Sequence, residues 1–150
     1  MKKILVALFI NLFTASLVLA SGPADEAKMA KAMVEEAVSF FNNQGKEKAL
    51  AEFSNPKGKF VKGELYVFAY DLNATIIAHP INPKLIGKSL LEVPDADGKL
   101  FRKEIAELAK TKGSGWVDYK YKNPVSNKIE DKTTLIQKVG DVIICCGIYK

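Results

Sequence analysis

The hydrophobic pattern of this chain changes from helical to strand spacing near Glu64. Upstream of that point, apolar side chains recur every three or four residues, at Met29, Met33, Ala37 and Phe40 or Phe41. This spacing predicts a long helix from Ala24 to Asn43 with one apolar face. A second, shorter helix is predicted from Lys46 to Phe53.

Downstream of Glu64, short segments rich in aromatic and β-branched residues alternate with turns, which is typical of strands. Five strands are predicted, at residues 65–70, 75–79, 115–122, 133–139 and 142–149. One helix from about Lys99 to Lys110 interrupts them, with Leu100 or Phe101, Ile105 and Leu108 facing inward. The predicted order is two helices, a β-hairpin, a crossover helix and three strands. This order is typical of an α+β domain with a five-stranded antiparallel sheet.

The N-terminus has the pattern of an export signal. A basic start precedes an almost wholly apolar run from Ile4 to Leu19, and short side chains at Val18 and Ala20 suit cleavage after Ala20. We therefore expect a signal peptide over residues 1–20, a single domain over residues 21–150 and a periplasmic location. An uncleaved membrane anchor is the alternative, because the run is near the minimum length that spans a bilayer.

The charge distribution excludes one class of partner. The formal net charge of the full chain is +5, but the lysines are interspersed with acidic residues. Because no long basic run forms a nucleic-acid face, we predict no nucleic-acid partner. A mild positive field suits small anionic ligands. With His79 as its single histidine, the chain offers no convincing set of metal ligands, and no cofactor is predicted.

Two further motifs have both a functional and a structural interpretation. Asp95-Ala-Asp-Gly98 resembles the start of a calcium loop but lacks the further oxygen ligands of an EF-hand, so we expect it to cap the following helix. Cys145 and Cys146 are adjacent, and on a strand their side chains point to opposite faces, which makes a disulfide between them geometrically poor. A redox pair and two buried apolar side chains are both open, and we favour the second.

The motifs of this chain also occur in a characteristic order. They are Tyr66-Val-Phe-Ala-Tyr-Asp71, Ala78-His-Pro80, Leu85-Ile-Gly87, Asp95-Ala-Asp-Gly98-Lys99, Gly115-Trp-Val-Asp-Tyr119, Asn123-Pro124, Lys132 and Gly147-Ile-Tyr149. This ordered set resembles the single Cache domain family, type 2, whose members are PAS-like extracytoplasmic sensor modules of bacterial chemoreceptors and histidine kinases. The resemblance implies a PAS-like Cache domain, with a long N-terminal helix packed on a five-stranded antiparallel sheet and a small-molecule pocket on one face. It also implies a small carboxylate ligand, such as acetate, propionate, pyruvate or lactate.

The resemblance also bears on partners. Similar domains usually continue into a membrane helix and a signalling domain, whereas this chain stops at Lys150, just after the last predicted strand. We therefore expect the free-standing periplasmic kind, which senses or takes up its ligand through a membrane receptor, a histidine kinase or a transporter. A monomer and a homodimer are both open, because the long first helix can pair with a second copy or pack on its own sheet.

A buried carboxylate needs several hydrogen-bond donors and preferably one cation. Lys132, which matches the family's motif, can supply the cation, and His79 can supply a ring N–H. The remaining candidate pocket residues are the tyrosines and rings nearby in the predicted strands, namely Tyr66, Phe68, Tyr70, Trp116 and Tyr119.

Strand alternation divides these candidates. It places Trp116 and Asp118 on one face of their strand and Val117 and Tyr119 on the other. We therefore predict a pocket in which Lys132 acts with either Trp116 or Tyr119. Asp118 either accepts a hydrogen bond from Lys132 and orients it or forms a surface salt bridge.

The chain departs from the family's pattern at three places. Similar domains commonly have Lys-x-x-Tyr, and Leu135 stands at the tyrosine position here. This predicts an apolar end to the pocket, which favours short aliphatic monocarboxylic acids over hydroxyacids. Ala74 replaces the usual glycine of the hairpin turn, and Cys145-Cys146 replaces small residues in the last strand.

We predict that the protein is not an enzyme. His79 with Asp71 or Asp118 is the only candidate acid–base pair, and no serine lies in a nucleophile-elbow motif. The adjacent cysteines lack the two-residue spacing of thiol oxidoreductases. An interaction protein with a vestigial pocket remains the other alternative, since it would have the same fold.

Overall fold

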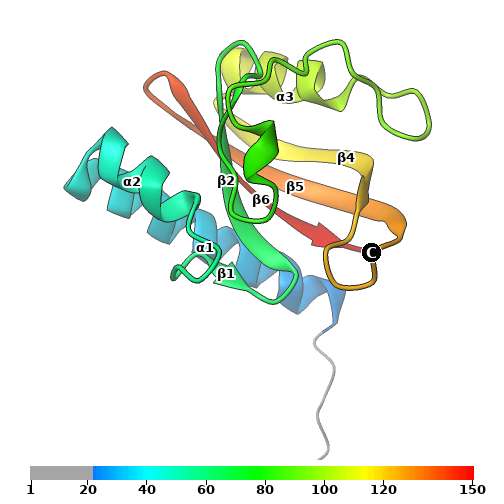
Figure 1. Ribbon diagram of the computed structural model, residues 1–150, viewed down its shortest axis with the longest axis horizontal. Helices are drawn as coiled ribbons and strands as arrows, with labels where there is room; N and C mark the ends of the chain where they lie inside the picture. Colours follow the sequence, from blue (N-terminus) through cyan, green and yellow to red (C-terminus); the bar gives the residue numbers. More distant parts are fainter. Residues whose placement is uncertain (1–21) are drawn as a thin grey trace, which may run out of the picture.

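The computed structural model describes residues 22–150, so the predicted signal peptide at 1–20 lies outside the described residues. Two helices lead the chain, with α1 at Pro23–Gln44 and α2 at Lys46–Phe53, which confirms both predicted helices (Figure 1). Gly45 ends α1 at a φ of 83°, a conformation that costs glycine nothing. Among residues 22–150, no helix is both long enough and apolar enough to cross a membrane.

The buried face of α1 is rotated from the predicted one. Ala30, Met33, Val34 and Ala37 are buried, and their spacing is the ordinary one for a helix face. Met29 is 44% exposed because it lies at the edge of this face, so its predicted core position is wrong.

The sheet has six strands, all paired antiparallel. They are β1 (Val61–Lys62), β2 (Leu65–Asp71), β3 (Ile76–Ala78), β4 (Ser114–Lys122), β5 (Ile129–Val139) and β6 (Val142–Tyr149). The order along the sheet is β1-β2-β6-β5-β4, and β3 pairs with β2. The five predicted strands are confirmed, and the two-residue β1 is an addition too short for a sequence pattern to indicate.

The sheet buries a different core on each face. On one face, α1 and α2 pack against alternate residues of the strands, such as Val67 and Cys146. On the other face, helix α3 (Phe101–Thr111) packs against the intervening residues, such as Phe68 and Cys145. The two cysteines are both free, and each belongs to a different core. Strand alternation therefore separates their side chains as predicted.

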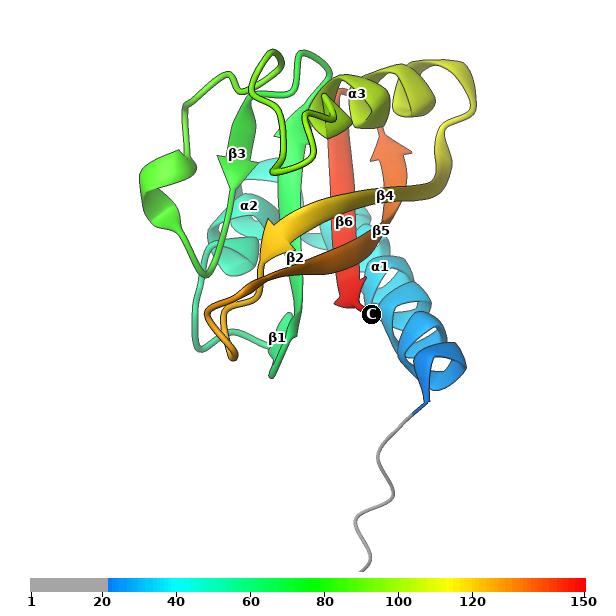
Figure 2. The same ribbon diagram turned by 90° about the vertical axis from the view of Figure 1, so that its right-hand side faces the viewer.

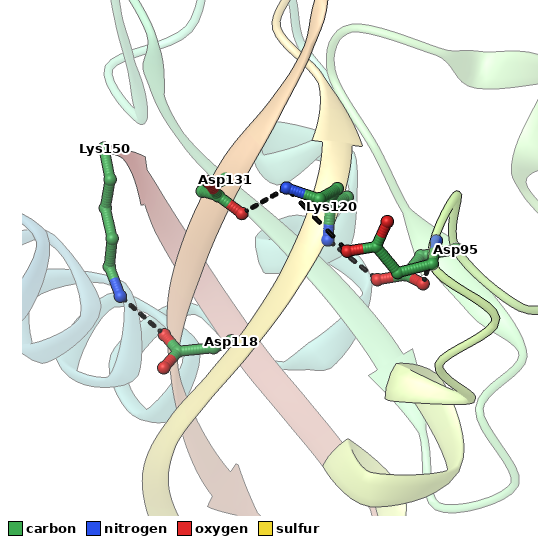
Figure 3. A network of polar contacts seen from close by, with 6 residues as sticks. Asp95, Asp118, Lys120, Asp131 and Lys150 are labelled. Carbon is green, nitrogen blue, oxygen red and sulfur yellow. Dashed lines mark hydrogen bonds and ion pairs between the residues drawn. The ribbon is translucent and has the colours of Figure 1, made fainter.

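Helix α3 begins at Phe101, and no side chain caps it, so the predicted capping role of Asp95 is wrong. The Asp95 carboxylate instead accepts hydrogen bonds from the backbone N–H groups of Asp97 (3.0 Å), Lys99 (2.8 Å) and Lys120 (2.8 Å). The last of these lies on β4, so Asp95 fastens the loop before α3 to the edge of the sheet (Figure 3).

The β4–β5 hairpin curves over the α3 face of the sheet, in front of β2 and β6 in Figure 2. Asn123, at the turn of this hairpin, donates to Glu64 Oε1 (2.8 Å) just before β2 and to Glu130 Oε2 (2.7 Å) on β5. These bonds hold the hairpin tip near the start of β2, although β4 and β5 do not pair with that strand.

Candidate functional site

A buried lysine lies on the α3 face of the sheet. Lys132 comes from β5, is 1% exposed, and its Nζ donates to the hydroxyl oxygens of Tyr66 (2.9 Å) and Tyr149 (3.3 Å). Its Nζ also lies 4.4 Å to 5.5 Å from the ring centroids of four aromatic side chains, namely Tyr66, Phe68, Tyr121 and Tyr149. None of the ion pairs among residues 22–150 includes Lys132.

The register of the sheet explains why this lysine is buried. Lys132 pairs with Tyr149 on one side and with Tyr119 on the other, so its side chain shares their face of the sheet. The stem crosses over Gly147 of β6, where the absence of a side chain leaves room for it. Burial lowers the pKa of the Lys132 ammonium from 10.5 to about 7, because the charged form loses its hydration.

His79 follows β3 directly and is 3% exposed. Its Nδ1 accepts hydrogen bonds from the backbone N–H groups of Ile81 (3.2 Å) and Asn82 (3.0 Å). These bonds assign the neutral ring the tautomer with its proton on Nε2, which leaves Nε2–H as a donor. Burial, followed by the charges of Lys132 and Arg102, lowers the pKa of His79 to about 4, so the ring is neutral near pH 7.

The His79 ring lies beside the lysine's aromatic partners. Its centroid is 5.4 Å from that of Tyr66 and 5.7 Å from that of Phe68. A cavity of about 260 Å³ opens here, which we call the His79 cavity, and it is lined by Tyr66, His79, Ile81, Asn82, Tyr121, Lys122, Pro124 and Asn127. The cavity therefore has an aromatic wall, a neutral histidine and a tyrosine that contacts Lys132.

The structure brings some of the predicted residues together. Lys132, His79, Tyr66 and Phe68 form one cluster through the contacts given above. Tyr70 lies next to Phe68, with 5.7 Å between ring centroids, but deeper toward α3. Tyr119 is buried on the same face, where its hydroxyl is bonded to Thr134 Oγ1 (2.8 Å) and its ring stacks on Phe101 at 3.9 Å.

Two other predicted residues are not brought to this cluster. Trp116 and Leu135 are cross-strand partners on the opposite face of the sheet, where Leu135 packs against the α1 core and Trp116 is 42% exposed. The reason is strand alternation, since Leu135 is three residues from Lys132 on β5 and three residues along a strand reverse the face.

Asp118 also lies away from Lys132. Its carboxylate pairs with Lys150 at 3.0 Å at the surface, so the predicted alternative in which it orients Lys132 is wrong (Figure 3). Nearby, Lys120 pairs with Asp131 at 2.7 Å. A hollow of about 430 Å³ at this edge is lined by these acids and lysines and also by Lys132, which forms no ion pair with them.

Three residues of the site were missed by the sequence analysis. Tyr121 and Tyr149 were available from strand alternation, because Tyr121 shares a face with Tyr119 and Tyr149 is the cross-strand partner of Lys132. The Tyr149 hydroxyl donates to the Lys122 carbonyl oxygen (3.0 Å) and is thereby held in place for Lys132. Arg102, on α3, had no such signal, because a basic residue in the first turn of a helix is ordinarily solvated.

Comparisons with known proteins identify the family of this chain. The profile of the Single Cache domain 2 family matches residues 26–150. The methyl-accepting chemotaxis protein McpP of Pseudomonas putida is 35% identical over 86 residues, which is 56% of this chain but 16% of that receptor.

Two solved structures share the fold. A periplasmic sensor domain of a chemotaxis protein superposes with a TM-score of 0.66 at 24% identity, covering 84% of this chain and 91% of its own. A Cache chemosensory domain, described as the structural basis for carboxylic acid recognition, superposes with a TM-score of 0.63 at 25% identity, covering 84% and 89%. With its family profile matched from Glu26 to the last residue, this chain belongs to the Single Cache domain 2 family.

Proposed function

We propose that this protein is a periplasmic sensor or binding domain for a small carboxylate, with short-chain monocarboxylic acids as its simplest ligands. The observation that carries the proposal is Lys132, a buried cation with no acidic partner among the described residues, next to a cavity lined by His79. A bound carboxylate would supply the missing negative charge.

The donors around the cavity match the needs of a carboxylate. An anion removed from water is stabilised when hydrogen bonds and a cation replace its hydration. Lys132 offers an ammonium, His79 offers Nε2–H, and the Tyr66 hydroxyl already contacts Lys132. The Phe68 ring supplies an apolar surface for a short alkyl chain. Leu135 cannot fill this role because its side chain packs against the α1 core. Recognition of this kind needs no metal.

The likeness to a Cache domain that recognises carboxylic acids supports this ligand class. The likeness to McpP supports a role in chemotaxis or signal transduction, although the chain spans 16% of that receptor. We propose that ligand occupancy is read by a partner, either a membrane receptor, a histidine kinase or a transporter. The protein would then bind its ligand without chemical turnover.

The proposal is tested by thermal shift and calorimetric titration of the purified protein with acetate, propionate, butyrate, lactate and pyruvate. Binding to the folded state raises the melting temperature, so at least one acid should do so in proportion to its affinity. Lys132→Met should abolish this shift. Lys110→Met, at an exposed position on α3, is the matched control and should keep it. If no acid binds at millimolar concentration, the pocket is vestigial and the proposal is wrong.

A further inference from the structure

Arg102 is a second buried cation on the same side of the sheet. It is the only arginine in the sequence, lies in the first turn of α3 and is 5% exposed. Its Nη1 donates to the Val93 carbonyl oxygen at 3.3 Å, and its guanidinium lies 4.2 Å from the Phe101 ring centroid. Its Nε is buried without a hydrogen-bond partner.

No acid among the described residues neutralises Arg102. The ion pairs of residues 22–150 do not include it, and Glu104 of the same helix pairs with Lys99. Asp95 lies nearby, but its two carboxylate oxygens accept three backbone N–H groups. Of the guanidinium's five N–H donors, the one on Nε is buried without an acceptor, while the hydroxyls of Tyr70 and Tyr121 lie close enough to the guanidinium for it to lower their pKa values against the effect of burial.

Arg102 lines a cavity of about 310 Å³, which we call the Arg102 cavity. Its walls are Val93, Pro94, Asp95, Ala96, Phe101, Arg102, Lys120, Tyr121, Lys122 and Ile129. Tyr121 and Lys122 also line the His79 cavity, so the two cavities share part of their walls.

Tyr121 lies between the two buried cations. Its ring centroid is 5.3 Å from Lys132 Nζ. Burial raises the pKa of its hydroxyl, and the neighbouring Arg102 guanidinium opposes that rise. After burial, the charges of Lys132 and Arg102 both lower the pKa of His79, so both lie within electrostatic range of that ring.

We propose that Arg102 is a second cationic contact for the ligand, and that the site therefore prefers a short dicarboxylate to a monocarboxylate of the same length. One carboxylate lies at Lys132 beside His79, and the other lies at Arg102 on the far side of Tyr121. This inference rests on the proposed function, because it places the second charge of the ligand in the same site. Two carboxylates neutralise both buried cations, whereas one leaves a cation unpaired. The planar guanidinium suits a carboxylate because it can bind both oxygens.

The test compares acids matched in length, with butyrate against succinate and propionate against malonate. Calorimetric titration of the unmodified protein should give dicarboxylates about tenfold or more tighter binding, the effect of one added charge-assisted pair. Arg102→Gln should remove this preference while changing monocarboxylate affinity by about threefold or less. Arg102→Lys should retain part of the preference. Lys103→Gln, on the exposed side of the same helical turn, should change neither affinity.

Each outcome has a distinct meaning. If the unmodified protein binds butyrate as tightly as succinate, or if Arg102→Gln keeps the preference, the inference is overturned while the proposed function stands. If neither class of acid binds, the proposed function itself fails. If thermal unfolding shows that Arg102→Gln does not fold, the test uses Arg102→Lys instead. An unchanged preference for dicarboxylates in Arg102→Lys overturns the inference.

Discussion

Gly147 on β6 lies directly beneath the stem of Lys132, the lysine of the candidate site. A methyl group at position 147 would overlap Cε of Lys132 and the hydroxyl oxygen of Thr134, closer than non-bonded atoms approach. The backbone of Gly147 has no positive φ, so glycine is needed here for space and not for conformation. The smallest residue of the last strand thus determines where the buried cation lies.

Gly147→Ala should therefore weaken ligand binding and destabilise the fold. Overpacking of this kind typically costs about 1–3 kcal/mol of unfolding free energy. Chemical denaturation gives the stability, and titration with the preferred acid gives the affinity. In the double variant Gly147→Ala/Lys132→Ala, the removed stem relieves the overlap with Lys132 and leaves only that with Thr134, so the two stability effects should not add. Additive losses would contradict the steric explanation.

Lys132→Met should abolish ligand binding and yet raise the stability of the ligand-free protein. A buried ammonium without an acidic partner is costly, and an apolar side chain of similar length avoids that cost, by about 1–4 kcal/mol in comparable replacements. The Tyr149 hydroxyl keeps its bond to the Lys122 carbonyl oxygen in the variant. Denaturation without ligand is the measurement. A lower stability than the unmodified protein would indicate that the bonds of Lys132 to Tyr66 and Tyr149 outweigh its desolvation.

Asp95→Ala should loosen the segment between β3 and α3. The lost carboxylate leaves three backbone N–H groups without their acceptor, which we expect to cost about 1–2 kcal/mol. Amide hydrogen exchange should accelerate at Lys99 and Lys120, while the β5–β6 core stays protected. Asp97→Ala is the matched control, because its carboxylate makes only a surface ion pair with Lys120 at 3.8 Å. Equal acceleration in both variants would show that Asp95 does not fasten this loop.

The fold was predictable because local patterns and tertiary packing agree. The helical spacing of α1 and α2 and the alternating β2 strand each match a face that is buried in the structure. Met29 was wrongly placed in the core because helical spacing identifies the buried face of α1 but does not define the edges of that face. The two-residue β1 was not predictable, because its pairing with β2 is determined by the turn at Gly63.

The site was predictable in part. Strand alternation predicted that Tyr66 and Phe68 share a face, and the resemblance to the family's motif indicated Lys132. The structure brings the three side chains together. The prediction for Leu135 was wrong because Leu135 is three residues from Lys132 on β5, and alternation directs its side chain to the α1 face. The burial of Arg102 was not predictable from the sequence, because it depends on how α3 and the loop at Val93 pack on the curved hairpin. Contacts between distant segments of this kind leave no periodic signal in a sequence.

The stability of the ligand-free protein should rise with pH in two separate windows. The pKa of His79 is lowered from 6.5 to about 4, so between those values the unfolded chain binds more protons than the folded one and stability rises with pH. The pKa of Lys132 is lowered from 10.5 to about 7, and the same sign applies from pH 7 to about 9; above that pH the buried thiols of Cys145 and Cys146, whose pKa values are raised, oppose it. Thermal unfolding against pH measures both. Lys132→Met should remove the upper window and narrow the lower one, because the Lys132 charge helps to lower the pKa of His79. An upper rise that persists in this variant would belong to another group.

Ligand affinity should change with pH in the opposite direction to that upper stability window. A carboxylate binds the charged form of Lys132, whose pKa in the free protein is about 7, so affinity is greatest below pH 7. Above that value each pH unit should weaken binding by about tenfold, because one proton must be taken up with the anion. Titrations at pH 6.5, about 7.5 and about 8.5, in buffers with different ionisation enthalpies, measure both the affinity and the proton uptake. Binding that is independent of pH over this range, with no proton uptake, would mean that Lys132 is not the cation that meets the ligand, and would leave Arg102 as the charge that holds it.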